Sequence, residues 1–215
     1  MSDTSPAEKK RRTRIEPEAR RRLIIEATML CITRHGHSGT TMERICEQAG
    51  VSIGLIGHHF SSKEELMLCT YQALTDQLRA ETEKSLVRKG DSARERLNAM
   101  IKSAFNRSIF NEFTLTTWLG FWGATTSSPE LKKLNRKLYI DYRVDLDKCF
   151  ELAAQEQGTS IDSRAAALTM TALIDGFWLE WTLDQKAFSA LKAQTLCIQV
   201  ADMLLAVNNN YKDIF

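Results

Sequence analysis

Apolar residues recur every three or four positions along most of the chain, which is the spacing of one face of an α-helix. Over about residues 18–36 this spacing is carried by Leu23, Ala27, Leu30 and Cys31. Pro17 suits the first turn of such a helix, and Gly36 suits its end. The pattern predicts a first helix over this range.

The same spacing, with breaks between the segments, predicts eight further helices. Three of their starts carry a Ser or Thr followed three residues later by Glu, the capping-box spacing, namely Thr40 with Glu43, Ser62 with Glu65 and Ser92 with Glu95. Thr41 is the alternative to Thr40 as the cap of its helix. The eight helices are expected over about 41–50, 52–59, 62–88, 92–110, 114–126, 129–157, 162–184 and 189–208. Strand signals are weak, since no sustained alternation of apolar and polar residues occurs. We predict an all-α protein of about nine helices.

The composition is that of a globular protein from a reducing compartment. Hydrophobic residues make up 43% of the 215 positions, enough for a sizeable core. An odd number of cysteines without a Cys-x-x-Cys pair argues against a disulfide framework; they are Cys31, Cys46, Cys69, Cys149 and Cys197. The N-terminus is charged, unlike a secretion signal, and no apolar run approaches the ~18 residues of a membrane span. We therefore expect a cytoplasmic protein with no membrane partner.

The net charge of +2 is unevenly distributed along the chain. Residues 1–22 hold eight Lys or Arg and four acids, a local charge of +4 that leaves −2 for the remainder. Basic ends of this kind bind polyanions such as nucleic acids by releasing counterions. A solvated tail that only aids solubility is the alternative.

The stretch 41–60, TMERICEQAGVSIGLIGHHF, has the features that a helix-turn-helix requires. Ala49 is small enough for two helices to cross closely, and Gly50 permits a left-handed turn. Val51 anchors that turn, and Ser52 caps the second helix. Each feature alone is common. Together, behind a basic end, they predict a DNA-binding element.

Residues 20–75 resemble the N-terminal domain of the TetR family of one-component repressors, most clearly through GVSIGLIGHHFSSKEEL. The resemblance implies that the helix over 52–59 enters the major groove of double-stranded DNA. The implied phosphate contacts are Thr41, Ser52, His58, His59 and Lys63, and the implied base-facing residues are Gly54, Leu55 and Gly57. It also implies a disordered basic arm over 1–17, a helix-turn-helix domain over 18–65, and a helical ligand-binding and dimerisation domain over 66–215.

The expected recognition helix departs from the family pattern. Gly57 stands where a bulky aromatic is usual, and the helix has no Arg, Asn or Gln for bidentate base contacts. Contact of Leu55 with thymine methyl groups and close backbone approach at the glycines remain available. For His58 and His59, ordinary surface histidines are the alternative. No metal site is expected, since adjacent side chains point to different faces of a helix.

Two aromatic segments follow in the second half of the chain, TWLGFWG over 117–123 and LIDGFWLEWTLD over 173–184. The aromatic residues at helical spacing are Trp118, Phe121 and Trp122 in the first segment, and Trp178 and Trp181 in the second. Indole faces attract cations, so an aromatic cavity with a carboxylate suits a quaternary ammonium ion. Packing in a core or an interface is the alternative for these rings.

Asp175 is the candidate carboxylate, one helical turn before Trp178 in an apolar stretch. An acid buried in such surroundings needs a partner. That partner is either a cationic ligand or an arginine of the chain, such as Arg107 or Arg143.

The two aromatic segments, together with RRRLIIEAT and AGVSIGLIGHHF, resemble the choline-responsive BetI type of the TetR family, which controls glycine betaine synthesis. The resemblance implies choline or a related quaternary ammonium compound as the effector, and no cofactor. It also implies a homodimer, paired through the last two helices, on a palindromic operator. The helix over 62–88 is expected to couple the two domains by a small pivot. A different cation, an acyl compound or an aromatic drug is the alternative effector.

Two other classes of protein are alternatives to a repressor. An enzyme acting on a small amine is disfavoured, because the chain has no P-loop, G-x-S-x-G or H-E-x-x-H motif. A non-specific architectural DNA-binding protein is the second alternative, and it would ignore small molecules.

Overall fold

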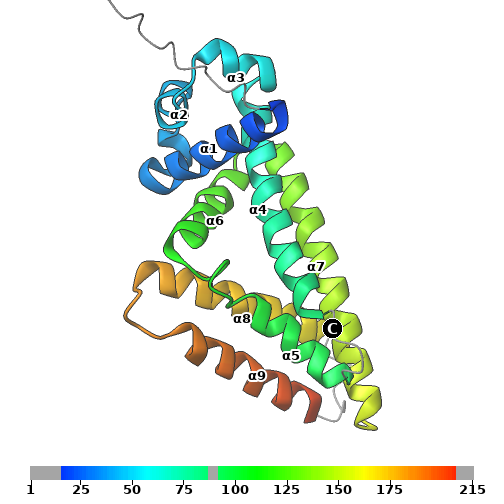
Figure 1. Cartoon of the computed structure of the whole chain (residues 1–215). Coiled ribbons are helices and arrows are strands. Elements are labelled where there is room, and N and C mark those ends of the chain that lie inside the picture. The colour runs from blue at the N-terminus through cyan, green and yellow to red at the C-terminus, as the bar shows by residue number, and fades with distance from the viewer. Residues whose placement is uncertain (1–15, 87–91, 207–215) are drawn as a thin grey trace, which may run out of the picture.

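Nine α-helices and no strand make up residues 16–86 and 92–206, the part of this computed structural model that is described (Figure 1). They are α1 (Pro17–Gly39), α2 (Met42–Ala49), α3 (Ile53–His59), α4 (Lys63–Leu86), α5 (Ala93–Ser103), α6 (Glu112–Thr125), α7 (Pro129–Glu156), α8 (Ser163–Leu183) and α9 (Ala190–Ala206). The all-α prediction is confirmed. Most of the expected basic arm and the expected helix ends near residues 88 and 208 lie outside the described residues.

The helices form two groups that share α4. Figure 1 shows α1 to α3 gathered at one end, the long α4 and α7 running away from them, and α8 and α9 at the other end. The small core under α1 to α3 consists of Ile24, Cys31, Ile45, Ile56, Phe60 and Leu66. A larger core lies among α4 to α9 and takes in Ile32 of α1. Since α4 contributes Leu66 to one core and Tyr71 to the other, it connects the two groups.

The caps agree with the sequence at α5, and at α2 one of the two expected caps is present. Ser92 and Glu95 form a complete capping box. At α2 the cap is Thr41, whose side chain accepts a hydrogen bond from a backbone N–H. The expected box with Thr40 is wrong, because Thr40 is buried and its hydroxyl donates to the Gly36 carbonyl at 2.8 Å. Gly36 itself interrupts α1 with a φ of 69°, and a further turn follows to the end of that helix.

The helix expected over 92–110 is shorter than predicted, because α5 ends at Ser103. Trp178 Nε1 donates to the Ala104 carbonyl at 3.1 Å, so this carbonyl is held by a side chain from α8. Asn111 Nδ2 donates to two carbonyls of the preceding turn at 3.0 and 3.2 Å, and its Oδ1 caps α6. Asn side chains that bond nearby backbone in this way compete with the helical ladder. The chain therefore turns before it enters α6.

Composition predicted free cysteines and no membrane-spanning segment. All five cysteines are free thiols, as expected. Among the described helices, none combines the length and the apolar character that a membrane crossing needs.

Candidate DNA-binding surface and effector cavity

The turn between α2 and α3 is built as a helix-turn-helix. Gly50 ends α2 in the left-handed region with a φ of 63°. Ser52 Oγ caps α3 by accepting from the Leu55 N–H at 3.3 Å. Ile45 of α2 and Ile56 of α3 are fully buried in the small core. The apolar sides of both helices therefore face inward, and the outer face of α3 is left open.

The eight residues of the expected DNA-contact set lie on and around that open face. Four are exposed and four partly exposed; the exposed ones are Ser52, Gly54, Gly57 and His58, and the others are Thr41, Leu55, His59 and Lys63. A Cβ atom added at Gly54 or Gly57 would meet no atom within 4 Å. The two glycines therefore keep the surface flat without being required for packing inside the chain.

Arg21 holds the recognition helix in place, a role that its position in the basic end did not reveal. Its Nη1 donates to the His59 carbonyl at the end of α3, at 2.7 Å. Its Nη2 donates to Cys69 Sγ of α4 at 2.9 Å, and Glu65 lies 4.0 Å away. The guanidinium also lies 4.2 Å from the centroid of the Phe60 ring. One side chain of α1 thus braces α3 against α4.

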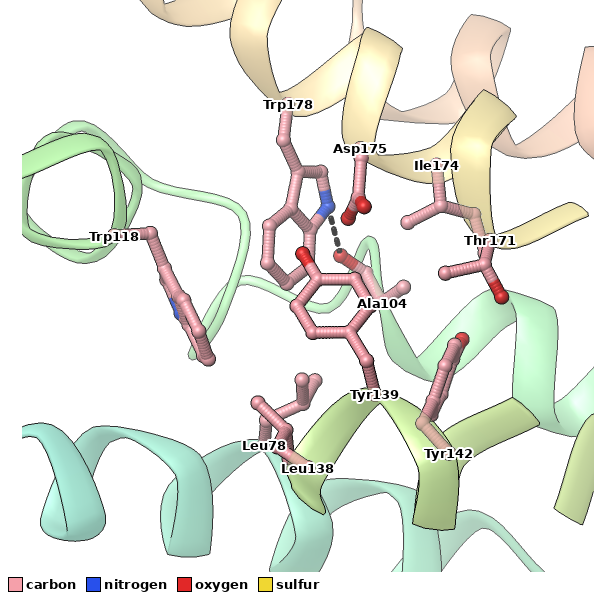
Figure 2. Close-up of a pocket in the computed structure, with 10 residues that line it drawn as sticks. All are labelled: Leu78, Ala104, Trp118, Leu138, Tyr139, Tyr142, Thr171, Ile174, Asp175 and Trp178. Atoms are coloured by element: carbon pink, nitrogen blue, oxygen red, sulfur yellow. Dashed lines mark hydrogen bonds between the residues drawn. The ribbon is translucent and has the colours of Figure 1, made fainter. Parts of the chain in front are cut away.

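A cavity lies among α4, α6, α7 and α8, with an empty volume of about 370 Å³ that includes space open to solvent (Figure 2). Its walls are Leu78, Ala104, Trp118, Leu138, Tyr139, Tyr142, Thr171, Ile174, Asp175 and Trp178. Three of these, Trp118, Asp175 and Trp178, belong to the expected effector set. Figure 2 shows Trp118 and Trp178 on neighbouring walls, with the Asp175 carboxylate directed from α8 toward Tyr139 of α7.

A second, more open cavity adjoins the first, with an empty volume of about 570 Å³ that includes space open to solvent. It is lined by Trp122, Thr125, Asn135, Tyr139, Asp175, Gly176 and Leu179, so Asp175 and Tyr139 belong to both cavities. The Trp122 ring stacks on Trp178 with centroids 6.5 Å apart, and Trp118 lies 5.8 Å from Trp178. Three tryptophans are therefore clustered at the shared wall.

Phe121 and Trp181, also in the expected effector set, line neither cavity. Phe121 is fully buried and packs against Tyr71 at 4.7 Å and His37 at 6.0 Å between ring centroids. Trp181 packs against Phe110 at 4.8 Å. Helix α6 is covered on more than one side, so its aromatic residues divide between the cavity and the packing against α1 and α4. Phe121 and Trp181 therefore pack against other side chains of the protein, which was the alternative to lining the effector cavity.

Tyr139 and Tyr142 of α7 are cavity residues that the sequence analysis missed. They are separated by three positions, as side chains on one helix face are, and both line the first cavity. In the sequence they lie in YIDYRVD, among charged residues, so the aromatic clustering that marks the other two segments is absent here. Only the packing of α7 against α4 and α8 brings them beside Asp175.

Asp175 has no cationic side chain beside it. Among the described residues none forms an ion pair with its carboxylate. Burial raises the pKa of Asp175 to about 6, although a hydrogen-bonding interaction with Tyr139 and the more distant charge of Arg143 act in the opposite direction. Burial and the charge of Asp175 together raise the pKa of Tyr139 above its ordinary range. Arg143 thus influences the acid without pairing with it, and Arg107 is exposed.

Three further polar atoms of the walls of the two cavities are buried without a hydrogen-bond partner in the described part of the chain. They are Trp118 Nε1, Trp122 Nε1 and Tyr142 Oη. Trp178 differs, because its Nε1 is held by the Ala104 carbonyl. Buried polar atoms are usually satisfied by protein, water or a ligand, so unpartnered ones around a cavity indicate an occupant.

Helix α6 joins the cavity to the DNA-binding end. Trp118 and Trp122 face the two cavities, while Thr117 Oγ1 lies 3.0 Å from Thr33 Oγ1 of α1. At Gly120 the approach is closer still, since an added Cβ would lie 2.6 Å from Cγ2 of Ile32. Because of these contacts, a displacement of α6 by a ligand would also displace α1.

Known proteins match this architecture over most of the chain. Residues 24–68 match the family model of bacterial regulatory proteins of the TetR family, and residues 93–206 match that of the C-terminal domain of the BetI-type transcriptional repressor. The HTH-type transcriptional regulator BetI 2 of Chromohalobacter salexigens is 34% identical over 196 residues, which cover 90% of this chain and 92% of the relative.

Solved structures are similar as well. A transcriptional regulator from Pseudomonas aeruginosa PAO1 has a TM-score of 0.83 and 34% identity, covering 93% of this chain and 97% of that one. A transcriptional regulator from Saccharomonospora viridis, solved in complex with choline, has a TM-score of 0.76 at 22% identity, covering 87% and 97%. At 22% identity, the similarity to the Saccharomonospora viridis regulator shows a shared fold. From the family models and the identity to the relatives, the chain belongs to the TetR family of transcriptional regulators, with a C-terminal domain of the BetI type.

Proposed function

We propose that this regulator is a repressor that senses choline or a related quaternary ammonium compound in the cavity beside Asp175, and that it controls genes of betaine synthesis or choline transport. The observation that carries the proposal is a partly buried carboxylate without a cationic partner among the described residues, next to three clustered tryptophans. A quaternary ammonium ion would neutralise Asp175, and its methyl groups would contact the rings without needing acceptors. The bound choline of the Saccharomonospora viridis regulator supports the same choice.

The proposal is tested by titrating tryptophan fluorescence with choline and with 3,3-dimethylbutan-1-ol, a neutral molecule of the same shape. Choline is expected to bind at least about tenfold more tightly, because only choline supplies a charge to Asp175. Equal affinities would contradict recognition of a cation, and no response to millimolar choline would contradict the choice of effector.

The same titration should depend on pH. Only ionised Asp175 attracts the cation, and its pKa in the free protein is raised to about 6. We expect constant affinity above about pH 7 and a loss approaching tenfold per unit below pH 6, because protons then compete with choline. Affinity that stays constant down to pH 5 would show that another group holds the ligand.

The proposed dimer surface lies on α8 and α9. Large apolar side chains are exposed on these helices, at Leu168, Leu179, Leu183, Leu191 and Met203. Exposed apolar groups of this kind suit a twofold interface in which the same patch meets itself. Two recognition helices related by the axis would read half-sites roughly 34 to 36 Å apart, or a multiple of that spacing.

The exposed glycines of α3 give a test of the proposed DNA surface. Gly54→Ala and Gly57→Ala each add a methyl group that meets no atom within 4 Å in the free protein. We expect each variant to be as stable as the wild type, or more stable by up to about 1 kcal/mol, because alanine favours helix.

If bases approach these positions, each variant should weaken binding to an operator selected from random duplexes by the wild-type protein, by about tenfold. Fluorescence anisotropy measures the affinity, and thermal unfolding measures the stability. Unchanged operator binding by both variants would place the base-facing surface elsewhere.

A further inference from the structure

The second cavity gives the ligand room to extend beyond the charged group. Asp175 and Tyr139 line both cavities, so a cation against Asp175 lies at their boundary. Figure 2 shows the Tyr139 ring rising from α7 toward Asp175. A substituent on the nitrogen would pass Tyr139 and enter the space lined by Trp122, Thr125 and Asn135.

Asn135 carries unused donors of that space, as does Trp122 through its Nε1. Its Oδ1 accepts a hydrogen bond from Tyr71 Oη at 2.5 Å. No described residue accepts from its Nδ2. A side-chain amide has one carbonyl and two N–H donors, so Asn135 can offer a ligand donors only. The Thr125 hydroxyl donates its hydrogen bond to the Trp122 carbonyl at 2.7 Å, so it has no donor left for a ligand.

We propose that Asn135 binds an uncharged oxygen, a hydroxyl or a carbonyl, on the substituent of the quaternary ammonium ligand. This inference rests on the proposed function and narrows it to ammonium compounds that carry such an oxygen. An alkyl substituent would leave the amide donors without an acceptor. A carboxylate in the same space is opposed by the charge of Asp175.

The test compares choline with propyltrimethylammonium, in which a methyl group replaces the hydroxyl, by titration calorimetry. The wild type is expected to bind choline about tenfold more tightly, the range of one hydrogen bond. Asn135→Leu should lose that preference by weakening choline binding, with propyltrimethylammonium affected less than about twofold.

A control separates this contact from the structural one with Tyr71. Tyr71→Phe removes the hydroxyl that holds Asn135 Oδ1 but keeps the amide. We expect this variant to keep most of the preference for choline, and thermal unfolding of both variants checks that they are folded. If Tyr71→Phe loses the preference as fully as Asn135→Leu does, Asn135 acts through its contact with Tyr71 and the proposal is wrong.

The remaining outcomes also decide the question. Equal binding of the two ligands by the wild type would overturn selection by oxygen, as would an Asn135→Leu variant that weakens both ligands to the same extent. In both cases quaternary ammonium sensing itself would stand. If the wild type binds its operator but neither ligand, the proposed function fails and this inference fails with it.

Discussion

Asp175→Asn should abolish choline binding and, at the same time, make the free protein more stable. The side chain keeps its shape and loses its charge. Removing one partner of a desolvated charge pair costs about 3 kcal/mol or more, so we expect at least about a hundredfold loss of choline affinity. Binding of the neutral 3,3-dimethylbutan-1-ol should change little. Fluorescence titration of the wild type and the variant measures both.

The gain in stability follows from the pKa of Asp175, which burial raises from an ordinary 3.8 to about 6. Because the folded pKa lies above the unfolded one, the wild type loses stability as pH rises from about 4 to 6, by roughly 3 kcal/mol. The variant has no such loss, so its Tm at pH 7 should be higher by on the order of 10 °C.

Glu151→Gln, which removes an exposed acid of α7, serves as the matched control and should leave both measurements unchanged. A variant at Asp175 that binds choline as the wild type does would refute the assignment of this carboxylate. An unchanged Tm with choline binding lost would instead indicate that Asp175 is better solvated in the free protein than its surroundings imply.

Gly120→Ala should disturb the contact between α6 and α1. The added Cβ would lie 2.6 Å from Cγ2 of Ile32, which is fully buried and, being β-branched, has little freedom to turn away. Overpacking of this kind costs about 1 to 3 kcal/mol, against a gain of up to about 1 kcal/mol in helix propensity. We expect the Tm to fall by several degrees and operator affinity to fall as well, since α1 positions the recognition helix through Arg21.

Gly123 offers a matched control on the same helix, because an added Cβ there meets no atom within 4 Å. Gly123→Ala should therefore keep or slightly raise the Tm. An Ile32→Ala background removes the clashing methyl group, so Gly120→Ala should cost less there than in the wild type. Equal effects of Gly120→Ala and Gly123→Ala would contradict a tight contact between α6 and α1.

The fold could be predicted from the sequence where the signals were local. Helical spacing, the Ser92 cap and the Gly50 turn each depend on neighbours in the chain, and the structure has them. The expected helix over 92–110 was too long because its end depends on the bond from Trp178, a residue far away in sequence. Asn111, directly after the expected helix, is a sequence signal for a turn at this point.

The candidate cavity was only partly predictable for the same reason. Trp118, Asp175 and Trp178 stood out as aromatic and acidic residues in apolar stretches, and the cavity brings them together. Tyr139 comes from a helix whose sequence shows no aromatic cluster, and Phe121 faces another neighbour. The DNA-contact residues remain predictions, because their role depends on a bound DNA. The domain boundaries remain predictions as well.

A cation bound in the cavity beside Asp175 is proposed to change the affinity of the protein for its operator DNA. The most direct measurement is the affinity for the selected operator, by fluorescence anisotropy at fixed salt, with increasing choline or 3,3-dimethylbutan-1-ol. Choline should weaken operator binding by the typical allosteric range of about 5- to 150-fold in the wild type, and leave Asp175→Asn unchanged. Operator affinity that ignores choline, or that responds equally to the neutral molecule, would contradict the claim.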